Sequence, residues 1–224
     1  MTTVTTLVTE NEDDGFRWYD SGMGDWDFNN GANYVRVGSE DDGMGGANDM
    51  TPYFRFLEVD VPRDANITSA KLQYKLYASY DNSSSRTTKI YGQKPGGGDC
   101  DSTDITDGEA LQSALEELTD GTGVDGSGYT TWTPATSTDT TNYQDSADFT
   151  DVIQELVNRS CWKETEEDYS AITIFLTDNT AATPMGPYYM AIKSIESGHP
   201  VKLVIDYTEA SSAVSNPAFL LFMD

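Results

Sequence analysis

Two runs of alternating apolar and polar residues, between positions 53 and 77, constrain the fold of this chain most strongly. In the first run, Phe54 and Phe56 are separated by Arg55. In the second, apolar residues occupy every second position, at Ala70, Leu72, Tyr74 and Leu76. Successive side chains of a strand point to opposite faces, so each run has one apolar and one polar face. The sequence therefore predicts an antiparallel pair of half-buried strands at the centre of an all-β sandwich.

The remaining chain predicts further strands and two short helices. Strands are expected at residues 2–8, 34–38, 86–93, around Trp132, and at 170–177, 188–195 and 201–207. Apolar residues at helical spacing predict helices over 109–119 and after Thr150. Residues 13–33 are expected to form a long loop or an irregular hairpin. We predict one jelly-roll β-sandwich domain over residues 1–210, with two short helices in its connections, followed by an apolar tail at 211–224.

The charge of the chain is strongly negative. Its 224 residues include 38 acidic and 13 basic side chains, for a net charge of −25. Nucleic-acid binding needs clustered lysine and arginine, and anionic membranes also attract basic segments, so neither is an expected partner. Self-repulsion at this charge is relieved by salt or by bound cations. Two compatible interpretations follow, adaptation to a saline environment and divalent cations held in the loops.

Two acidic runs are candidate calcium ligands, because Ca²⁺ prefers carboxylate oxygens. The candidate residues are Asp99, Asp101, Asp104, Glu40, Asp41 and Asp42. The first run does not follow the EF-hand pattern, since Asp104 stands where that loop needs glycine. The alternative is that both runs are solvated acidic loops. With a single histidine and two distant cysteines, the sequence does not favour zinc.

Three aromatic residues form the candidate carbohydrate-binding site. Trp18, Tyr19 and Trp26 lie in a segment rich in glycine and aspartate. Such aromatic rings could stack on sugar rings while nearby polar groups bind the hydroxyls. The alternative is that they cover the end of the sandwich or a subunit contact, because exposed aromatic area is usually buried.

Catalytic motifs are weak in this chain. His199, the only histidine, lies in a Gly-His-Pro turn, and no Gly-x-Ser-x-Gly elbow accompanies it. Cys100 and Cys161 could pair, but the sequence favours two unpaired thiols. Residues 1–10 lack the basic start and apolar core of a secretory signal, and no apolar run approaches 18 residues. We therefore expect a protein that is not an enzyme and does not span a membrane.

Several short motifs follow one another in a recognisable order. They are Asn-Tyr-Val-Arg-Val-Gly at 33–38, Phe-Arg-Phe at 54–56, Val-Pro at 61–62, Ile-Thr-Ser-Ala-Lys-Leu at 67–72, the helix at 149–157 with Trp162, Ser-Ile-Glu at 194–196 and Pro-Val-Lys-Leu-Val-Ile-Asp-Tyr at 200–207. This order resembles the DNRLRE-type β-sandwich modules. The resemblance implies a jelly roll of the kind used as a carbohydrate-binding module in secreted enzymes. Sandwiches similar to these modules also occur in the tail and surface proteins of marine and haloarchaeal viruses, so the resemblance also implies a possible place on a virus particle.

The functional prediction is a non-enzymatic structural protein on the exterior of a virus particle, assembled in the host cytoplasm. It would serve as a head decoration, turret or tail component in a saline setting, and bind other copies of itself, other virion proteins or a host-surface glycan. The alternative is a carbohydrate-binding module for a polysaccharide or host glycan. The tail residues expected to add a strand or dock on a neighbour are Phe219, Leu220, Leu221, Phe222 and Met223.

We predict that the melting temperature rises with NaCl or with millimolar Ca²⁺. The screening length falls from about 10 Å at 0.1 M salt to about 3 Å at 1 M, which weakens repulsion among the carboxylates. Thermal scans at low and molar NaCl, with and without a chelator, measure this effect. Superimposable scans would contradict both interpretations of the acidic composition.

Overall fold

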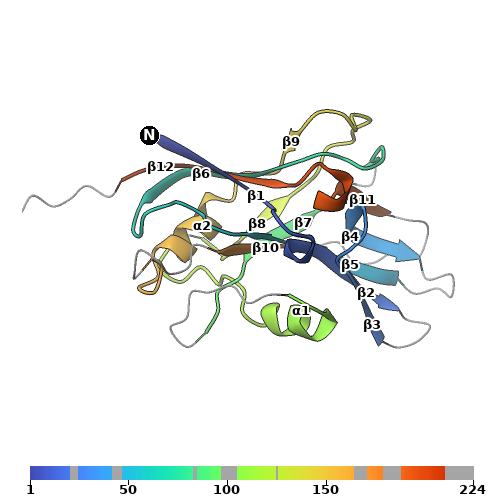
Figure 1. The fold of residues 1–224 in the computed structure, drawn as a ribbon, viewed down its shortest axis with the longest axis horizontal. Helices are drawn as coiled ribbons and strands as arrows, with labels where there is room; N and C mark the ends of the chain where they lie inside the picture. The colour runs from blue at the N-terminus through green and yellow to red at the C-terminus, as the bar shows by residue number, and fades with distance from the viewer. Residues whose placement is uncertain are drawn as a thin grey trace, which may run out of the picture.

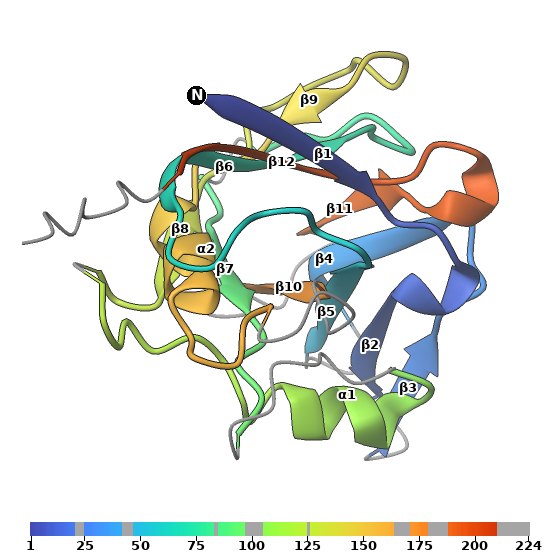
Figure 2. The ribbon, with the colours of Figure 1, turned by 60° about the vertical axis from the view of Figure 1, so that its left-hand side comes forward.

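The computed structural model describes residues 1–20, 25–41, 47–82, 85–96, 105–124, 126–163, 171–178 and 188–209. These residues form a β-sandwich of two antiparallel sheets (Figures 1 and 2). Sheet A contains, in spatial order, β1 (Thr2–Leu7), β12 (Lys202–Thr208), β6 (Asn66–Tyr74) and β9 (Gln144–Asp145). The predicted single sandwich is thus present in the described part of the chain.

Sheet B is the larger sheet. Its main path is β11 (Tyr188–Lys193), β4 (Tyr34–Asp41), β5 (Ala47–Phe56), β10 (Ile172–Asp178), β7 (Thr88–Gly92) and β8 (Tyr129–Trp132). Strand β2 (Asp14–Asp20) also pairs with β5, and forms a hairpin with β3 (Asp25–Asn29). Of the two expectations for residues 13–33, a long loop or an irregular hairpin, the structure has a hairpin, and its register is regular from Phe16 to Asp20. The all-β jelly-roll prediction is confirmed, with short helices confined to the connections.

The predicted pairing of the two central runs is wrong. Strand β5 lies in sheet B, whereas β6 lies in sheet A. The connection between them carries Val59 and Val61, which are fully buried, and crosses from one sheet to the other. Alternation of apolar residues identifies the buried face of a strand but not its partner, so two consecutive strands with inward apolar faces can also face each other across a sandwich.

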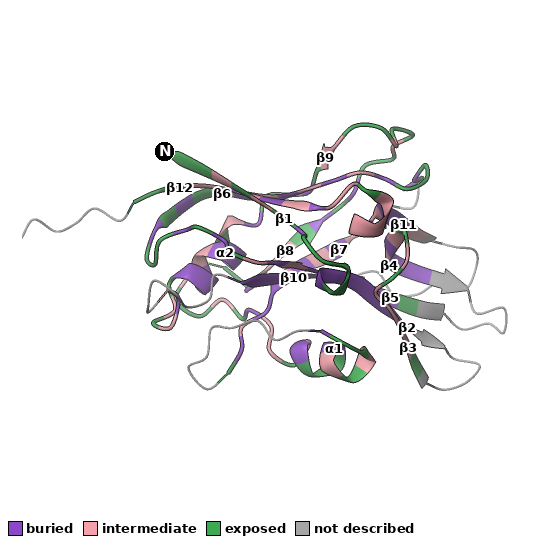
Figure 3. Ribbon diagram, viewed as in Figure 1, coloured by how far each residue is buried: buried purple, intermediate pink, exposed green. Residues whose placement is uncertain are grey.

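The core fills the space between the two sheets, and Figure 3 shows buried residues along strands of both sheets. Leu72 of β6 and Leu203 of β12 are directly opposite each other in sheet A and are 1% and 0% exposed. Ile174 of β10 enters the same core from sheet B, and Leu76 is buried beside them. The predicted inward register of these four residues is confirmed.

Helix α1 (Gly108–Ala114) is shorter than the predicted helix at 109–119. Asp107 caps its start by accepting hydrogen bonds from the backbone amides of Glu109 and Ala110. Helix η1 (Asn11–Asp13) leads into β2, and η2 (Ile195–Ser197) joins β11 to β12. Among the described residues, no helix is long and apolar enough to cross a membrane.

Helix α2 (Thr150–Val157) packs on the core through the predicted stripe Val152, Ile153, Leu156 and Val157. Glu155 is also buried, so α2 carries a carboxylate into the core beside the four apolar residues. Glu155 accepts hydrogen bonds of 2.7 Å from Lys94 Nζ and 2.8 Å from the Gly121 amide. The ion pair and the amides compensate the lost hydration of this carboxylate, and so attach α2 to the loops beside β7.

Cys161, just after α2, is disulfide-bonded. Among the described residues there is no free cysteine, so the prediction of an unpaired thiol at Cys161 is wrong. The sequence contains one other cysteine, Cys100, which lies outside the described residues, as do the tail residues Phe219–Met223. A disulfide is typical of proteins that work in oxidising surroundings such as the cell exterior or a virion surface.

We predict that Leu72→Ala or Leu203→Ala lowers the free energy of unfolding by about 2–5 kcal/mol, the usual cost of truncating a buried leucine. Chemical denaturation of each variant measures the loss. Val204→Ala, on the outer face of the same strand, is the matched control and should cost much less. A loss below about 1 kcal/mol at both leucines would contradict the described core.

We also predict that reducing the Cys161 disulfide lowers the melting temperature. Disulfides typically contribute about 2–4 kcal/mol by restricting the unfolded chain, which corresponds to a shift on the order of 10 °C here. Thermal scans with and without a phosphine reductant measure the shift. The Cys161→Ser variant should melt at the lower temperature and ignore the reductant. Titratable thiols in the unreduced, unfolded chain would contradict the bond.

Candidate lysine and tyrosine binding surface

Six of the thirteen lysines and arginines of this acidic chain contact a carboxylate of the described residues: Arg55 pairs with Asp13, Arg63 with Asp64, Lys71 with Asp145, Arg86 with Asp178, Lys94 with Asp120 and Glu155, and Lys163 with Asp60. Four lysines form no ion pair with any carboxylate of the described residues, namely Lys75, Lys89, Lys193 and Lys202. Of these, Lys75, Lys193 and Lys202 gather at one end of the sandwich, and each lies close to tyrosine.

Backbone pairing brings the three lysines together. The segment 75–77 continues from β6 and pairs with the free edge of β11, because the Lys193 amide donates to Lys75 O at 2.8 Å and the Tyr77 amide donates to Ala191 O at 2.9 Å. Leu76 and Ile192 form a β-bridge between these two hydrogen bonds. The chain therefore passes from sheet A to sheet B at this point, and Lys202 begins β12 nearby in sheet A.

Tyr143 is the aromatic centre of the sheet A half. Lys202 Nζ lies 4.0 Å and Lys75 Nζ 4.9 Å from the centroid of its ring. The Tyr143 hydroxyl donates a 3.1 Å hydrogen bond to Pro200 O, which fixes the ring before β12. Cation–π attraction orients both ammonium groups along the ring without neutralising them.

Lys193 and His199 lie between the two halves. Lys193 Nζ donates a 2.9 Å hydrogen bond to Thr140 O, in the loop before β9. Loss of hydration lowers the pKa of His199, and the charges of Lys75 and Lys193 lower it further. These two lysines therefore lie close enough to act on the imidazole. In Figures 1 and 2, the loop that carries β9 and the segment after β6 lie at the same end as β11.

The sheet B half is a stack of tyrosines around Arg36. The rings of Tyr34 and Tyr77 are 4.5 Å apart, and Tyr77 is 46% exposed. Arg36 lies 5.1 Å from the Tyr34 centroid and 4.5 Å from the Tyr189 centroid, and donates a 2.8 Å hydrogen bond to the Tyr34 hydroxyl. Tyr34 is directly opposite Lys193 in the pairing of β4 with β11. The two halves are therefore continuous.

We call this group the lysine–tyrosine surface. It comprises Lys75, Lys193, Lys202, Tyr34, Tyr77, Tyr143 and Tyr189, with Arg36 and His199 beside them. Ala191, opposite Arg36 on β11, supplies little bulk between the rings. Aromatic rings present flat apolar faces with polar edges, and the lysines add unneutralised positive charge. The arrangement can bind a flat, hydroxyl-rich ligand that also carries negative charge.

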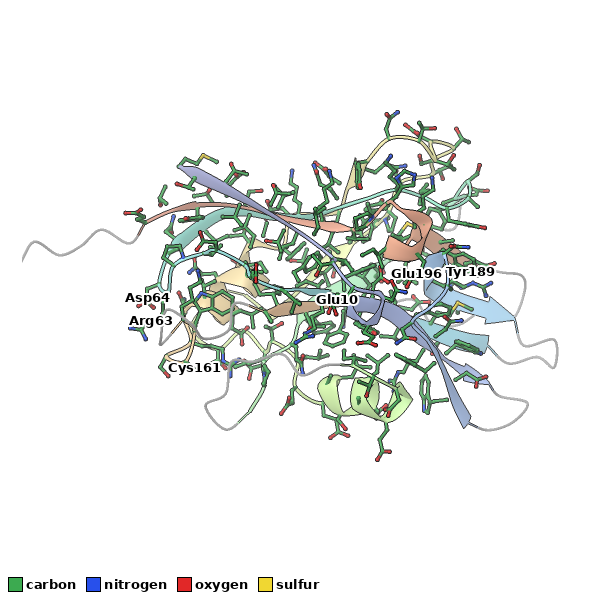
Figure 4. All side chains as sticks on the ribbon, in the orientation of Figure 1. Glu10, Arg63, Asp64, Cys161, Tyr189 and Glu196 are labelled. Carbon is green, nitrogen blue, oxygen red and sulfur yellow. The ribbon has the colours of Figure 1, made fainter. Side chains whose placement is uncertain are left out.

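A pair of buried carboxylates lies close to this surface. Asp14 opens β2 and is 1% exposed, and Glu196 belongs to η2, three residues after Lys193. Burial, and secondarily the charge of Glu196, raise the pKa of Asp14 to about 8. Figure 4 labels Glu196 and Tyr189 at the end of the sandwich where β4 and β11 lie.

The predicted aromatic site does not form one surface. Trp18 packs against the core together with Phe16, whose ring centroid is 5.4 Å away. Trp26 is 41% exposed and stacks under the guanidinium of Arg17 at 3.9 Å. In the β2–β3 pairing, Trp18 is opposite Asp27, and Trp26 is opposite Tyr19, the residue after Trp18. Successive residues of a strand point to opposite faces, so Trp18 and Trp26 lie on opposite faces of the hairpin. Tyr19 pairs with Trp26 in that register. A sugar site at Trp26 stays a prediction.

The predicted metal ligands fall largely outside the described residues. This applies to Asp42, Asp99, Asp101 and Asp104, and to the side chains of Glu40 and Asp41, whose backbone belongs to β4. Among the described residues, no group of three or more histidine, cysteine or acidic side chains is arranged to hold a metal ion.

Sequence reasoning missed the lysine–tyrosine surface. Its lysines stand far apart in the chain and match no motif, and His199 received no role. Only the pairing of 75–77 with β11 brings them together. Comparisons with known proteins add no further guide, since no protein-family model and no curated protein matches this chain.

Proposed function

We propose that this chain is a non-catalytic binding protein that recognises an acidic polysaccharide or acidic surface glycan through the lysine–tyrosine surface. The observation that carries the proposal is that three of the four lysines without ion pairs among the described residues gather on one surface, in a chain of net charge −25. With acidic side chains so abundant, lysines that no carboxylate neutralises are available to an anionic ligand.

The chemistry of the surface fits sugars that carry carboxylate or sulfate groups. Tyrosine rings can stack on the apolar faces of sugar rings, and their hydroxyls can bind sugar hydroxyls. Lys75, Lys193 and Lys202 would bind the acidic groups through charge-assisted hydrogen bonds. Because the surface runs from sheet A around to sheet B, it suits a chain of several sugars better than a single one.

The setting we propose is outside the cell, on a virus particle or in a secreted protein. The Cys161 disulfide supports an oxidising exterior. The resemblance to DNRLRE-type modules also favours a glycan-binding sandwich over an enzyme. The two settings differ in assembly: a virion component should form a symmetric oligomer, whereas a carbohydrate-binding module should be monomeric. Light scattering distinguishes them.

We predict that the chain binds polyuronates or sulfated glycans on a glycan array and ignores neutral glycans. Hydrogen bonds to charged groups contribute about 1.5–3 kcal/mol, so Lys75→Ala, Lys193→Ala and Lys202→Ala should each weaken binding roughly tenfold or more. Titration calorimetry with an oligouronate measures this loss. Tyr143→Ala should also weaken binding, because its ring positions Lys75 and Lys202.

Lys89→Ala is the matched control for these variants. Lys89 Nζ lies 4.3 Å from the ring centroid of Tyr129 on the β7–β8 pair, so it repeats the lysine-on-tyrosine contact away from the surface. Its loss should leave binding unchanged. Wild-type binding by the triple lysine variant would show that the surface is not the site, and binding of neutral glycans alone would contradict the proposed ligand class.

A further inference from the structure

Three buried carboxylate oxygens share one region of the molecule and accept no hydrogen bond from the described residues. They are Oδ1 of Asp14 and both side-chain oxygens of Glu196. A buried carboxylate oxygen normally accepts at least one hydrogen bond, because leaving it without a partner costs the hydration that it loses. When both are ionised, the two groups are like charges, and the charge of Glu196 contributes to the raised pKa of Asp14.

The backbone holds both carboxylates in place. The Ile195 amide donates to Asp14 Oδ2 at 3.1 Å, which links the start of β2 to η2 and leaves Oδ1 without a donor. Ser194 anchors the same connection, since its amide donates to Asn33 O at 3.3 Å and its hydroxyl to Ala32 O at 2.5 Å. The loop before β4 therefore runs alongside this connection, with its backbone turned toward it.

Cations of the described residues do not neutralise Asp14 or Glu196. Arg55, the one cation of β5, pairs at 3.4 Å with Asp13, and no ion pair of the described residues involves Asp14 or Glu196.

We propose that Asp14 and Glu196 bind one Ca²⁺ ion. The charge of the ion would balance the two carboxylates, and the three oxygens without donors would become ligands. Ca²⁺ takes six to eight oxygens and accepts backbone carbonyls and water alongside carboxylates. The proposal therefore needs only two acidic side chains, with water completing the coordination; among the described residues, no group of three or more histidine, cysteine or acidic side chains is arranged to hold a metal ion. The site is separate from the acidic runs that the sequence singles out.

Calcium titration of the full chain tests this proposal. After dialysis against EDTA and removal of the chelator, calorimetry with CaCl₂ should show one ion bound per chain. At Ca²⁺ one hundred times above Kd, the melting temperature should rise by roughly 5–10 °C. Asp14→Asn and Glu196→Gln should each abolish the heat of binding and the thermal shift. Circular dichroism in EDTA checks that both variants remain folded.

Asp13→Asn is the matched control. Asp13 is adjacent to Asp14 and equally buried, at 2% exposed, but its carboxylate pairs with Arg55 and accepts from Thr9. This variant should lose stability yet keep the calcium response. If Asp13→Asn fails to fold, Glu196→Gln alone still tests the proposal. The Glu196 side chain accepts no hydrogen bond, so this substitution removes none.

Three results would overturn the proposal. An unchanged calcium response in both variants would place the ion among other acids of the chain. Absence of any response to millimolar Ca²⁺, with Asp14→Asn melting higher than wild type, would show that the two carboxyl groups share a proton. An equal response to Mg²⁺ would exclude a calcium-selective site. The readouts need no glycan, so they are independent of the proposed glycan binding.

Discussion

Backbone pairing of residues 75–77 with β11 is the constraint on which the candidate surface depends. The hydrogen bonds from Lys193 to Lys75 and from Tyr77 to Ala191 join the end of sheet A to the edge of sheet B. Main-chain bonds do not depend on side-chain identity, so the join holds whatever residues occupy these positions. The side chains that it presents are then free to serve recognition. Binding sites are often built in this way, with a rigid backbone that positions side chains for recognition.

The same connection joins the two proposed sites. Strand β11 ends at Lys193, η2 carries Glu196, and β12 begins at Lys202. A bound cation at Glu196 would therefore stabilise the short connection between two lysines of the lysine–tyrosine surface. It would also lower the local density of negative charge directly beneath a surface that is proposed to attract anions. Neither effect requires a movement of the sheets.

Sequence patterns predicted the elements of this fold better than their arrangement. The alternation at Leu72 and Leu203 identified inward-facing positions correctly, because burial is a property of each strand. It could not show that β5 and β6 lie in opposite sheets, since a period of two is the same in both arrangements. Likewise, Trp18 and Trp26 are close in sequence, yet the hairpin register separates them onto opposite faces. The lysine–tyrosine surface forms only when segments far apart in the chain pack together, so no spacing of residues within one segment could predict it.

Recognition of an acidic polymer by a chain of net charge −25 requires a physical explanation. Long-range repulsion would oppose the encounter at low ionic strength, where the screening length is about 30 Å at 0.01 M. In molar salt that length shrinks to about 3 Å, and the distant carboxylates no longer act on the ligand. Charge-assisted hydrogen bonds between a bound acidic group and a lysine such as Lys202 would act over about 3 Å, no farther than this screening length. They therefore lose less of their strength than the repulsion does. An acidic protein can bind an acidic glycan in a saline setting because salt removes the opposing field faster than it weakens the local attraction.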